Sequence, residues 1–338
     1  MPAHNLDKAV GHESKPLPVA WNQRDLLLYA VGVRLHFFFG PLNEPPLTRD
    51  VFLIPQIGAR KDELAFTYED DPNWHPFPTY PLVLGLKGTN PSIANFATAK
   101  EGSAPNPGLP PLDPKKLVHA EQSIEILGEL PKESTEGWAL KKKCVGVKDT
   151  GKGLIVDDAM ELVDPSGKVV VRMISSGYCF GKFDTGGYQK SIAPKQPVKA
   201  GKPPQRNPDF VFSEKTTPEQ AVVYRLSGDY NPLHIDDAVG KGMGFPGVIL
   251  HGLCSYGHAA RAIVKNVAKG NGKRLKYMSA RFTSPVLPGD ELETTMWVSN
   301  DAESGGQRVD FVQKIKASGK VCLGGGVALI ASDKQSKL

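Results

Sequence analysis

The chain has 338 residues, of which 40% are hydrophobic and 23% are charged, a balance typical of a soluble globular protein. Its formal net charge of +5 suits an anionic, phosphate-bearing small molecule, but is too small and too dispersed to indicate a nucleic-acid partner. No apolar run approaches about 18 residues, so we expect no membrane span. The first residues lack the apolar core of a secretory signal peptide.

The first half begins with a helix and continues through a long region of loops. Asn22 is expected to cap a helix through RDLLLYAVGV, with Asp25 three residues later. Residues 37–114 are rich in Pro, Gly and aromatic side chains, which favours loops and short strands. Residues 117–127, LVHAEQSIEIL, predict a short helical piece that the following Gly and Pro residues would end.

Strands are expected next, before a region that cannot hold a core. The apolar or alternating runs are WALKKKCVGVKD, GLIVDDAMELVD and KVVVRMISSGYCF. Residues 183–209 are rich in Pro, Lys and Gly, a composition typical of a connector. We therefore expect a boundary between two parts of the chain here.

The second half opens with a helix start signal. Thr217 is expected to cap the helix EQAVVYRLSG, with Pro218 at its first position and Gln220 completing a capping box. The run GVILHGLCSYGHAARAIVKNVA has small and apolar residues at helical spacing over about four turns. Further strand-like runs follow up to residue 332, and one helix wrapped by strands predicts an α+β sheet curled over that helix.

The two halves have the pattern of two copies of one unit. LLLYAVGV aligns with AVVYRLSG, and LVHAEQ aligns with ILHGLC, with strands after each. At the places of Asp229 and His234 the first copy has Arg34 and Phe39, so the chemistry is expected in the second half alone. The aligned pairs are Tyr29 with Tyr224, His119 with His251, and Ala120 with Gly252.

A cluster of polar side chains, in the run DYNPLH, lies between the two helices of the second half. The residue before Pro232 is pushed towards extended geometry, so the first helix must stop near Gly228. Asp229 and His234 then lie on a short irregular segment that can direct both side chains into one cavity. An Asp-x-Asn-Pro run alone is usually a turn. Together with the histidine, and with Gly252 at the next helix start, it indicates a catalytic site.

The run Tyr224–His234, with His251-Gly252-Leu253 after it, resembles the signature of the hydratase 2 family, the (R)-specific enoyl-CoA hydratases of the MaoC-like group. Weaker similarity covers most of the chain, including Arg281-Phe282 and Pro285–Gly289. The resemblance implies two fused hot-dog units, each an antiparallel sheet around a central helix, with one active site. We expect a degenerate, acyl-chain-binding unit over residues 1–182, a linker over 183–209, a catalytic unit over 210–332 and a tail over 333–338.

Adding water across a conjugated thioester requires a base for the water, a proton for the α-carbon and fixed donors for the thioester oxygen. We predict that Asp229 is the base and that His234 helps to hold the water and move the proton, while Asn231 orients the water or locks one of the pair. By resemblance, Gly252 supplies an oxyanion-hole N–H, since a helix start has unpaired N–H groups. The sequence leaves open which residue protonates the α-carbon.

Other polar residues have weaker signals. His234, Asp236, Asp237 and His251 lack a recognised metal-ligand spacing, so no metal is expected, and His251 is expected to satisfy main-chain groups at the helix start. By resemblance, a lysine that contacts CoA in relatives is replaced here by Thr150, and Lys148 or Lys152 could substitute for it. The predicted substrate-binding set is His119, Ala120, Thr150, Tyr230, Pro232, Leu233 and Phe282.

The chain ends in Ser336-Lys337-Leu338, an address that the peroxisomal import receptor reads. The four cysteines, at widely separated positions without a C-x-x-C motif, are typical of buried thiols in a reducing compartment. We therefore expect a peroxisomal protein, and we expect it to be a homodimer.

These features predict a hydro-lyase of peroxisomal fatty-acid oxidation that interconverts trans-2-enoyl-CoA and (3R)-3-hydroxyacyl-CoA without metal or redox cofactor. Two alternatives stay open: a MaoC-like dehydratase of a specialised acyl-CoA, and a non-catalytic acyl-CoA-binding hot-dog protein. A thioesterase of this fold would not use the Asp-x-Asn-Pro-x-His arrangement. Because the first-half helix is expected to be short, a hollow should remain for a long or branched acyl chain, unless loops at 74–80 fill it.

Overall fold

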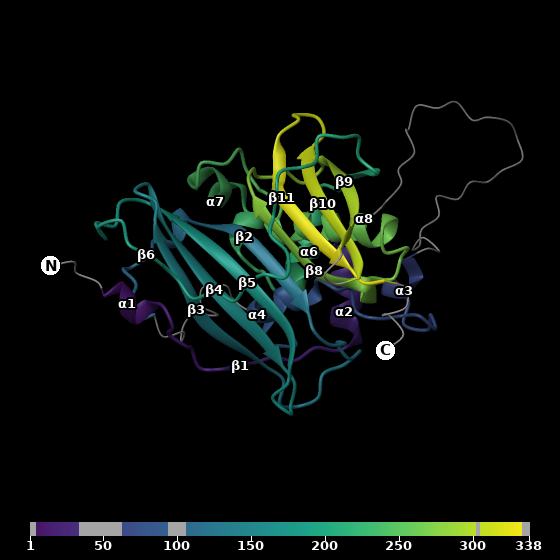
Figure 1. Ribbon diagram of the computed structural model, residues 1–338, viewed down its shortest axis with the longest axis horizontal. Helices are drawn as coiled ribbons and strands as arrows, with labels where there is room; N and C mark the ends of the chain where they lie inside the picture. The colour runs from purple at the N-terminus through teal and green to yellow at the C-terminus, as the bar shows by residue number, and fades with distance from the viewer. Residues whose placement is uncertain (1–4, 34–62, 94–105, 302–304, 333–338) are drawn as a thin grey trace, which may run out of the picture.

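The computed structural model describes residues 5–33, 63–93, 106–301 and 305–332. Within these ranges the strands form one antiparallel, eleven-stranded sheet in the order β1-β3-β4-β5-β2-β8-β11-β10-β9-β7, with β6 paired to β3 (Figure 1). The predicted α+β class is confirmed. The strands are β1 (Leu17–Pro18), β2 (Leu117–Ile126), β3 (Ala139–Asp149), β4 (Gly153–Val163), β5 (Val169–Phe180), β6 (Gln189–Ser191), β7 (Phe210–Lys215), β8 (Leu275–Phe282), β9 (Glu291–Asp301), β10 (Gly306–Ile315) and β11 (Val321–Ile330).

Helices are few and mostly short. The longest in the described ranges is α8, with 15 residues. No helix of these ranges is both long and apolar enough to cross a lipid bilayer. The α-helices are α1 (Leu6–Ala9), α2 (Gln23–Gly32), α3 (Leu64–Thr67), α4 (Leu84–Lys87), α6 (Gln220–Tyr224), α7 (Asp237–Gly242) and α8 (Gly252–Asn266). The 3₁₀ turns are η2 (Tyr80–Val83), η3 (Pro114–Lys116), η4 (Arg225–Ser227), η5 (Pro232–His234) and η6 (Gly272–Arg274).

The sheet consists of two repeats that meet where β2 pairs with β8. The strand order is β3-β4-β5-β2 in the first repeat and β8-β11-β10-β9 in the second, so β2 to β5 correspond in turn to β8 to β11. The joining ladder is antiparallel, and Ser123 pairs with Ser279 at its centre. The internal repeat predicted from the sequence is therefore confirmed for the strands.

The helices in front of the two repeats also correspond. Asn22 and Asp25 exchange the two hydrogen bonds of a capping box at 3.1 and 3.0 Å, so α2 begins as predicted. α6 packs against α2, with the Tyr29 and Tyr224 ring centroids 5.9 Å apart. The capping box predicted for α6 forms only in part. The Gln220 side chain accepts the Thr217 N–H at 3.5 Å, but the Thr217 carbonyl, and not its hydroxyl, accepts the N–H of Gln220, the first helical residue.

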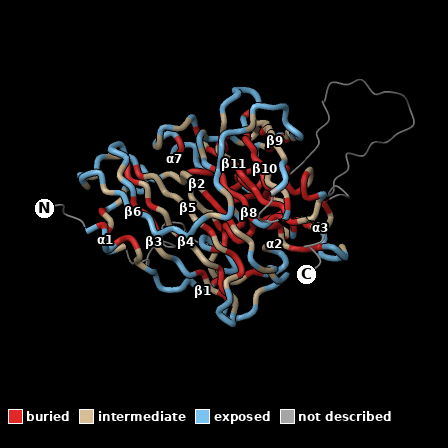
Figure 2. Tube along the Cα trace, in the orientation of Figure 1, coloured by how far each residue is buried: buried red, intermediate tan, exposed pale blue. Residues whose placement is uncertain are grey.

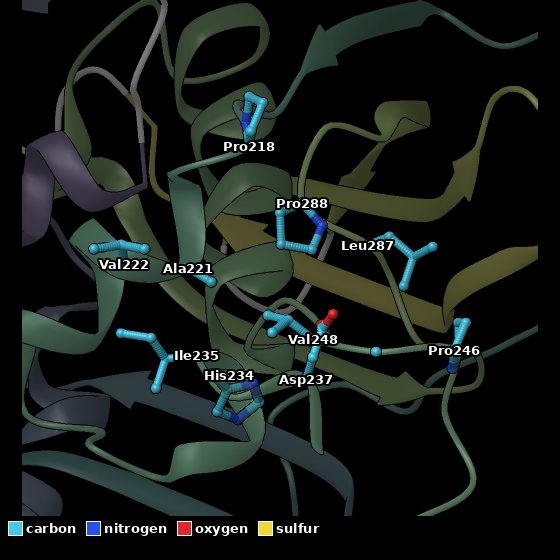
Figure 3. A pocket seen from close by; sticks show the side chains of 11 residues that line it. Pro218, Ala221, Val222, His234, Ile235, Asp237, Pro246, Val248, Leu287 and Pro288 are labelled. Atoms are coloured by element: carbon cyan, nitrogen blue, oxygen red, sulfur yellow. Dashed lines mark hydrogen bonds between the residues drawn. The ribbon is translucent and has the colours of Figure 1, made fainter. Parts of the chain in front are cut away.

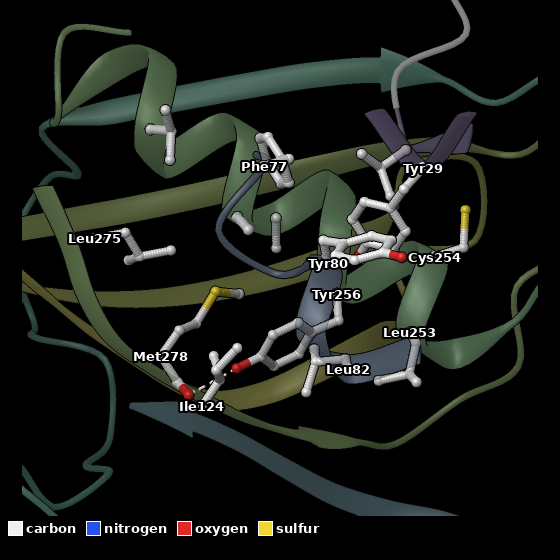
Figure 4. Packing of buried hydrophobic residues seen from close by; sticks show 14 of the residues in the cluster. Tyr29, Phe77, Tyr80, Leu82, Ile124, Leu253, Cys254, Tyr256, Leu275 and Met278 are labelled. Carbon is white, nitrogen blue, oxygen red and sulfur yellow. Dashed lines mark hydrogen bonds between the residues drawn. The ribbon is translucent and has the colours of Figure 1, made fainter. Parts of the chain in front are cut away.

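α8 lies at the centre of the second repeat. Every side chain from Leu253 to Val264 is buried, and the helix packs on β8, β9 and β11. Tyr256 anchors it by donating from Oη to the Met278 carbonyl at 2.7 Å. Figure 4 shows Tyr80 and Ile124 of the first half in the same cluster. In Figure 2 buried residues concentrate around β8, β10 and β11. One hydrophobic core therefore serves both repeats.

Residues 117–126 form strand β2, and the helical piece predicted there is wrong. The segment holds the helix formers Ala, Glu and Gln, and a register shift between His119 and Glu121 interrupts its alternation. However, its main chain pairs with β5 on one side and with β8 on the other. This pairing with distant strands outweighs the weak local propensity.

The predicted alignment of His119 with His251, and with it that of Ala120 with Gly252, is also wrong. Because β2 corresponds to β8, the counterpart of α8 is the region in front of β2. The described part of that region contains only the short helices α3 and α4 and the 3₁₀ turns η2 and η3, as its Pro-rich composition suggested. The predicted counterparts of the catalytic pair, Arg34 and Phe39, lie outside the described residues.

The region between the repeats, residues 183–209, carries side chains that are half-buried or exposed. Gln189–Ser191 forms β6 on the edge strand β3, and the Tyr188 hydroxyl donates to the Asp7 carboxylate at 3.0 Å. The first part of this region therefore runs along the outside of the first repeat. Its later part lies along the second repeat, where the Tyr277 hydroxyl donates to Gln196 at 3.0 Å and the Trp297 Nε1–H donates to the Arg206 carbonyl at 2.9 Å.

Candidate active site

The loop that carries the polar cluster begins at Gly228. Its φ of +134° is a backbone conformation that favours glycine. A Cβ at this position would lie 3.0 Å from the main-chain nitrogen of Lys87, at the end of α4. Lys87 in turn donates to the Ala20 carbonyl at 2.8 Å and pairs with Asp25 at 3.2 Å. The helix therefore stops where the sequence predicted, and the first half holds the loop that follows.

Hydrogen bonds from side chains to main chain shape the loop from Asp229 to His234. Asp229 Oδ1 accepts the Asn231 N–H at 3.3 Å, and Asn231 Oδ1 accepts the Leu233 N–H at 3.1 Å. The second bond caps η5, the turn that ends at His234. Asn231 thus locks the turn that carries His234, which is one of the two roles that the sequence left open for it.

His234 is buried, and its Nδ1 lies 2.8 Å from the Ile249 carbonyl oxygen. Because a carbonyl oxygen only accepts, Nδ1 carries the proton and Nε2 keeps a lone pair. Burial lowers the pKa of His234, although the nearby Asp229 carboxylate opposes this. The imidazole is therefore neutral at pH 7 and can accept a proton at Nε2.

Asp229, His234 and His251 each bring one nitrogen or oxygen atom within 4.8 Å of the others. Two such acceptors can hydrogen-bond the same water, since each bond spans about 2.8 Å. His251 Nε2 lies 3.1 Å from the Asp229 carbonyl oxygen, so it donates there, as expected for a histidine that satisfies main-chain groups. The other nitrogen of His251, Nδ1, is buried without a hydrogen-bond partner among the described residues. Asp229 and His234 are the members of this group that the sequence predicted to act on one water.

The neighbouring carboxylates have structural roles. Asp236 caps α7 by accepting the Ala238 N–H at 2.8 Å. Asp237 accepts the Val248 N–H at 2.9 Å and so ties α7 to the segment in front of α8. Both therefore stabilise the turn, as the sequence suggested.

Gly252 is the first residue of α8. The N–H groups of Cys254 and Ser255 donate to the His251 carbonyl, so the internal hydrogen bonding of the helix starts two residues later. A Cβ on Gly252 would lie 3.0 Å from the Phe282 ring, so no larger residue fits without displacing that ring. This main chain is therefore open to the cavity, with the positive end of the helix dipole behind it.

A cavity of about 1390 Å³ joins these groups and extends into the first half. Its apolar first-half wall comes from η2, α4 and the strands β3 and β4, and its other wall from the catalytic loop and α8. Of the residues predicted for the site, those that line it are Asp229, Asn231, His234, Gly252, His119, Leu233 and Phe282.

Four residues of the predicted substrate-binding set do not line this cavity: Ala120, Thr150, Tyr230 and Pro232. Ala120 lies at the register shift of β2. Thr150 lies in the exposed β3–β4 turn, where its hydroxyl donates to the Gly153 carbonyl at 2.9 Å. Tyr230 instead has the Arg225 guanidinium 5.3 Å from its ring centroid.

His119 of β2 reaches the cavity from the first half. Its ring centroid lies 4.7 Å from that of Phe282, and its Nε2 lies 3.0 Å from the Ser175 hydroxyl. Burial lowers the pKa of His119 to about 4, so the ring is neutral in the physiological range. It can contact a substrate but holds no charge.

Several residues that line the cavity have no recognisable signal in the sequence. Gln122 and Ser175 come together only because β2 pairs with β5. Residues 12–17 border the cavity because β1 and Glu13 pair with β3 from the far end of the chain. No local pattern encodes such contacts, so only the folded chain reveals them.

His234 also borders a second, shallower pocket of about 430 Å³ on the other side of the loop (Figure 3). Its other lining residues are mostly apolar and include Pro218, Val222, Ile235, Val248 and Leu287. Its carboxylate, Asp237, already accepts the Val248 N–H, and Asp229 is not among its lining residues, so Asp229 and His234 meet in the large cavity.

Comparison with known proteins decides the family. Residues 49–181 match the model of the MFE-2 hydratase 2 N-terminal domain, and residues 199–320 match that of the MaoC like domain. The probable dehydratase NIT22 of Ajellomyces capsulatus is 36% identical over 88% of this chain and 82% of its own length. The peroxisomal enoyl-CoA hydratase 2 of Arabidopsis thaliana is 33% identical over 96% of this chain and 94% of its own length. The chain belongs to the MaoC-like hydratase 2 family.

Solved structures agree on the fold. A MaoC-like dehydratase from Phytophthora capsici is 35% identical and superposes with a TM-score of 0.80 over 98% of this chain and 99% of that chain. A Mycobacterium tuberculosis protein described as having a double hotdog fold superposes with a TM-score of 0.50 at 12% identity, over 95% of each chain, which shows the fold alone. The hydratase 2 chain is thus a double hot-dog, as its sequence resemblance implied.

Proposed function

We propose that this hydratase 2 chain is a hydro-lyase that interconverts trans-2-enoyl-CoA and (3R)-3-hydroxyacyl-CoA. The observation that carries the proposal is the approach of Asp229 and His234 to one point of the cavity, beside the first residue of α8. Two relatives that align over nearly their whole length support the reaction class. They are named probable enoyl-CoA hydratase 2, from Dictyostelium discoideum, and peroxisomal enoyl-CoA hydratase 2, from Arabidopsis thaliana. A protein that only bound acyl-CoA would have no need of a carboxylate and a neutral imidazole at this point.

In the hydration direction, a water between Asp229 and His234 gives up a proton to the pair as its oxygen bonds to C3 of the enoyl group. The C2–C3 π electrons move towards the thioester, whose oxygen gains negative charge. The Gly252 N–H and the start of α8 stabilise that charge, an effect worth about a hundredfold in rate for one such donor. C2 then takes up a proton, and the pair releases the proton that it accepted, so one water has been added and the enzyme is unchanged.

The acyl chain is proposed to lie in the first repeat, where no helix like α8 has been described. Leu140 and Met160 of β3 and β4 border the cavity, as does Gly85 of α4. The predicted alternative was that residues 74–80 fill this hollow. Trp74, Phe77 and Tyr80 are buried in the core around α2 instead, and they are not among the cavity-lining residues. This arrangement supports acceptance of long or branched acyl chains.

The charged part of the substrate is proposed to lie near the lysines that border the cavity. Lys115 and Lys116 of η3 are exposed lining residues, and both carry unpaired positive charge among the described residues. Lys142 also lines the cavity but pairs with Asp158 at 2.9 Å. The two η3 lysines are thus better suited than Lys142 to the phosphates of CoA.

Peroxisomal location is part of the proposal. Relatives named as peroxisomal support it, and so does the C-terminal tripeptide, which lies outside the described residues. Its binding to the import receptor, like the expected homodimer, stays a prediction, and size-exclusion chromatography with light scattering would test the homodimer.

The decisive test is product analysis. Purified protein is incubated with four-carbon and long-chain trans-2-enoyl-CoA, and the hydroxyacyl products are resolved by chiral chromatography. We expect (3R) products from both. A (3S) product, or binding without turnover, would overturn the proposal.

A second candidate is a dehydratase of a specialised acyl-CoA, favoured by the 36% identity to a protein named probable dehydratase. The chemistry would be the same reaction in reverse. Poor turnover of all unsubstituted enoyl-CoA substrates, with efficient turnover of a substituted one, would favour this candidate.

A further inference from the structure

His251 occupies the N-cap position of α8, but its side chain makes no capping hydrogen bond. Ser, Thr, Asp and Asn are preferred at this position because their oxygen accepts an N–H of the first turn. The His251 imidazole is only 1% exposed. Helix capping therefore does not explain why a histidine stands here. Binding of the reacting water does not explain it either, because that role is proposed for Asp229 and His234.

The contacts of the His251 ring all belong to the catalytic loop and the helix in front of it. Its Nε2 donates to the Asp229 carbonyl oxygen at 3.1 Å. Its ring stacks on that of His234, with centroids 3.7 Å apart and planes inclined by 26°. On another side the ring centroid of Tyr224 lies 4.9 Å away. One side chain thus touches the main chain of the predicted base and the ring of its partner.

We propose that His251 is a positioning residue that sets the placement of Asp229 relative to His234, acting as a neutral imidazole with its proton on Nε2. This proposal rests on the proposed hydratase function. The N–H holds the main chain from which the Asp229 carboxylate projects. The His251 ring covers one face of the His234 ring and keeps water from that face. The hydrogen bond from His234 to the Ile249 carbonyl fixes the rotation of the His234 ring.

The charges around the ring agree with a neutral state. Burial lowers the pKa of His251 well below its ordinary value, and His234 and the Arg225 guanidinium lower it further. The Asp229 carbonyl acts in the opposite direction. The remaining neighbour from α6, the Tyr224 phenol, is kept uncharged because burial raises its pKa. A cationic His251 would also oppose proton uptake by the stacked His234, which the reaction requires.

Two substitutions separate the hydrogen bond from the ring. His251→Phe keeps an aromatic ring against His234 and removes the N–H. We expect kcat to fall between about 10-fold and 100-fold, with KM within twofold, because small misplacement of a reacting group has effects of this size. His251→Gln keeps an N–H for Asp229 but removes the ring, so kcat should fall less. In the His251→Gln variant the acidic limb of the pH profile of kcat should move to higher pH, because His234 becomes more hydrated and the pKa of His234 rises.

His75→Gln is the matched control. His75 is buried, and its Nδ1 is 2.7 Å from the Asn73 carbonyl, but it packs on Phe66 and does not line the cavity. This variant should keep the wild-type kcat and pH profile whatever its thermal stability. The proposal is overturned if His251→Phe keeps the wild-type kcat. It is also overturned if both His251 variants lose activity in step with a loss of stability, with no change in the pH profile.

Nitrogen NMR of the histidine rings in the wild-type protein gives a test that needs no variant to fold. We expect His251 to show the Nε2–H tautomer without titrating between pH 6 and 9. An Nδ1–H tautomer, or titration near the ordinary histidine pKa of about 6.5, would overturn the proposal. Turnover of trans-2-butenoyl-CoA by the wild type tests the hydratase function separately, so failure of either idea is recognised on its own.

Discussion

The two repeats of this double hot-dog share their strand order but differ in what lies against the sheet. In the second repeat, α8 is buried along most of its length against β8, β9 and β11. In the described part of the first repeat the corresponding segment holds only the short α3 and α4 and the turns η2 and η3, and a cavity remains beside Leu140 and Met160. The same architecture is thus packed in one half and hollow in the other.

This difference shows why two repeats are useful for one reaction. The start of a helix provides N–H donors and a positive dipole end for the thioester oxygen. However, a helix that fills the curve of its sheet leaves no space for an acyl chain, because protein interiors are close-packed. One repeat can therefore supply the donors while the other supplies the volume. The site lies where the loop after Gly228, which belongs to the second repeat, packs against the first repeat.

The largest expected effect comes from removing the chemistry of the second repeat. Asp229→Asn and His234→Ala should each lower kcat by about 10³-fold or more while the protein stays folded, since each removes proton transfer. The double variant should lose little more kcat than either single variant, because the two residues act as a unit. Steady-state kinetics with trans-2-butenoyl-CoA measures this. Asp236→Asn is the control, and substantial turnover by either single variant would remove that residue from the mechanism.

The start of α8 should be nearly as sensitive. Gly252→Ala would place a Cβ 3.0 Å from the Phe282 ring. We expect kcat/KM to fall about 10-fold to 100-fold, because the ring or the N–H donor must shift away from the thioester. Adding Phe282→Leu should restore part of the loss. Gly242→Ala, where a Cβ meets nothing within 4 Å, should leave the kinetics unchanged. Wild-type kinetics for Gly252→Ala would contradict a role for this close approach.

Filling the first repeat should affect long substrates alone. A Cβ on Gly85 would lie 3.6 Å from Leu140 and 3.9 Å from Met160, which are ordinary contacts. The Gly85→Leu variant should therefore fold, and its leucine side chain should project into the cavity. We expect kcat/KM to fall at least about 10-fold for long chains and to stay within twofold for the four-carbon substrate, as lost apolar burial predicts. Gly85→Ala is the smaller control. An equal loss for all chain lengths would place the acyl chain elsewhere.

The pH dependence of kcat should also distinguish the roles of the two repeats. Burial lowers the pKa of His234, so the acidic limb of kcat should lie below pH 6.5, with activity lost as the falling pH protonates this ring. His119, whose pKa is about 4, is expected to contact substrate without exchanging protons. His119→Gln should therefore raise KM and leave the limb in place. A displaced limb in this variant would give His119 a role in proton transfer.

The smallest expected effect on catalysis comes from the C-terminal tail. Deleting Ser336–Leu338 should leave kcat and KM unchanged, because the site lies in the cavity shared by the two repeats. The same deletion should move the protein from peroxisomes to the cytosol, as fluorescence microscopy of a tagged protein would show. An unchanged distribution would mean that this tripeptide is incidental.

The sequence by itself determined what depends on neighbouring residues. The Asn22–Asp25 capping box, the helix stop at Gly228 and the irregular segment from Asp229 to His234 all form as predicted. So does α8. Each is specified by local backbone preferences or by helical spacing, and these act within a few residues along the chain. The family signature is equally local, which is why it could be recognised from one sequence.

The tertiary structure alone decided what depends on distant partners. Residues 117–126 contain helix formers but become the central strand β2, because β5 and β8 pair with both of their edges. That pairing corrects the alignment of His119 with His251. It also brings Gln122 and Ser175 to the cavity, while the fold stacks His251 on His234. These outcomes follow from long-range pairing and packing, whose free energy is gained only when segments far apart in the chain meet.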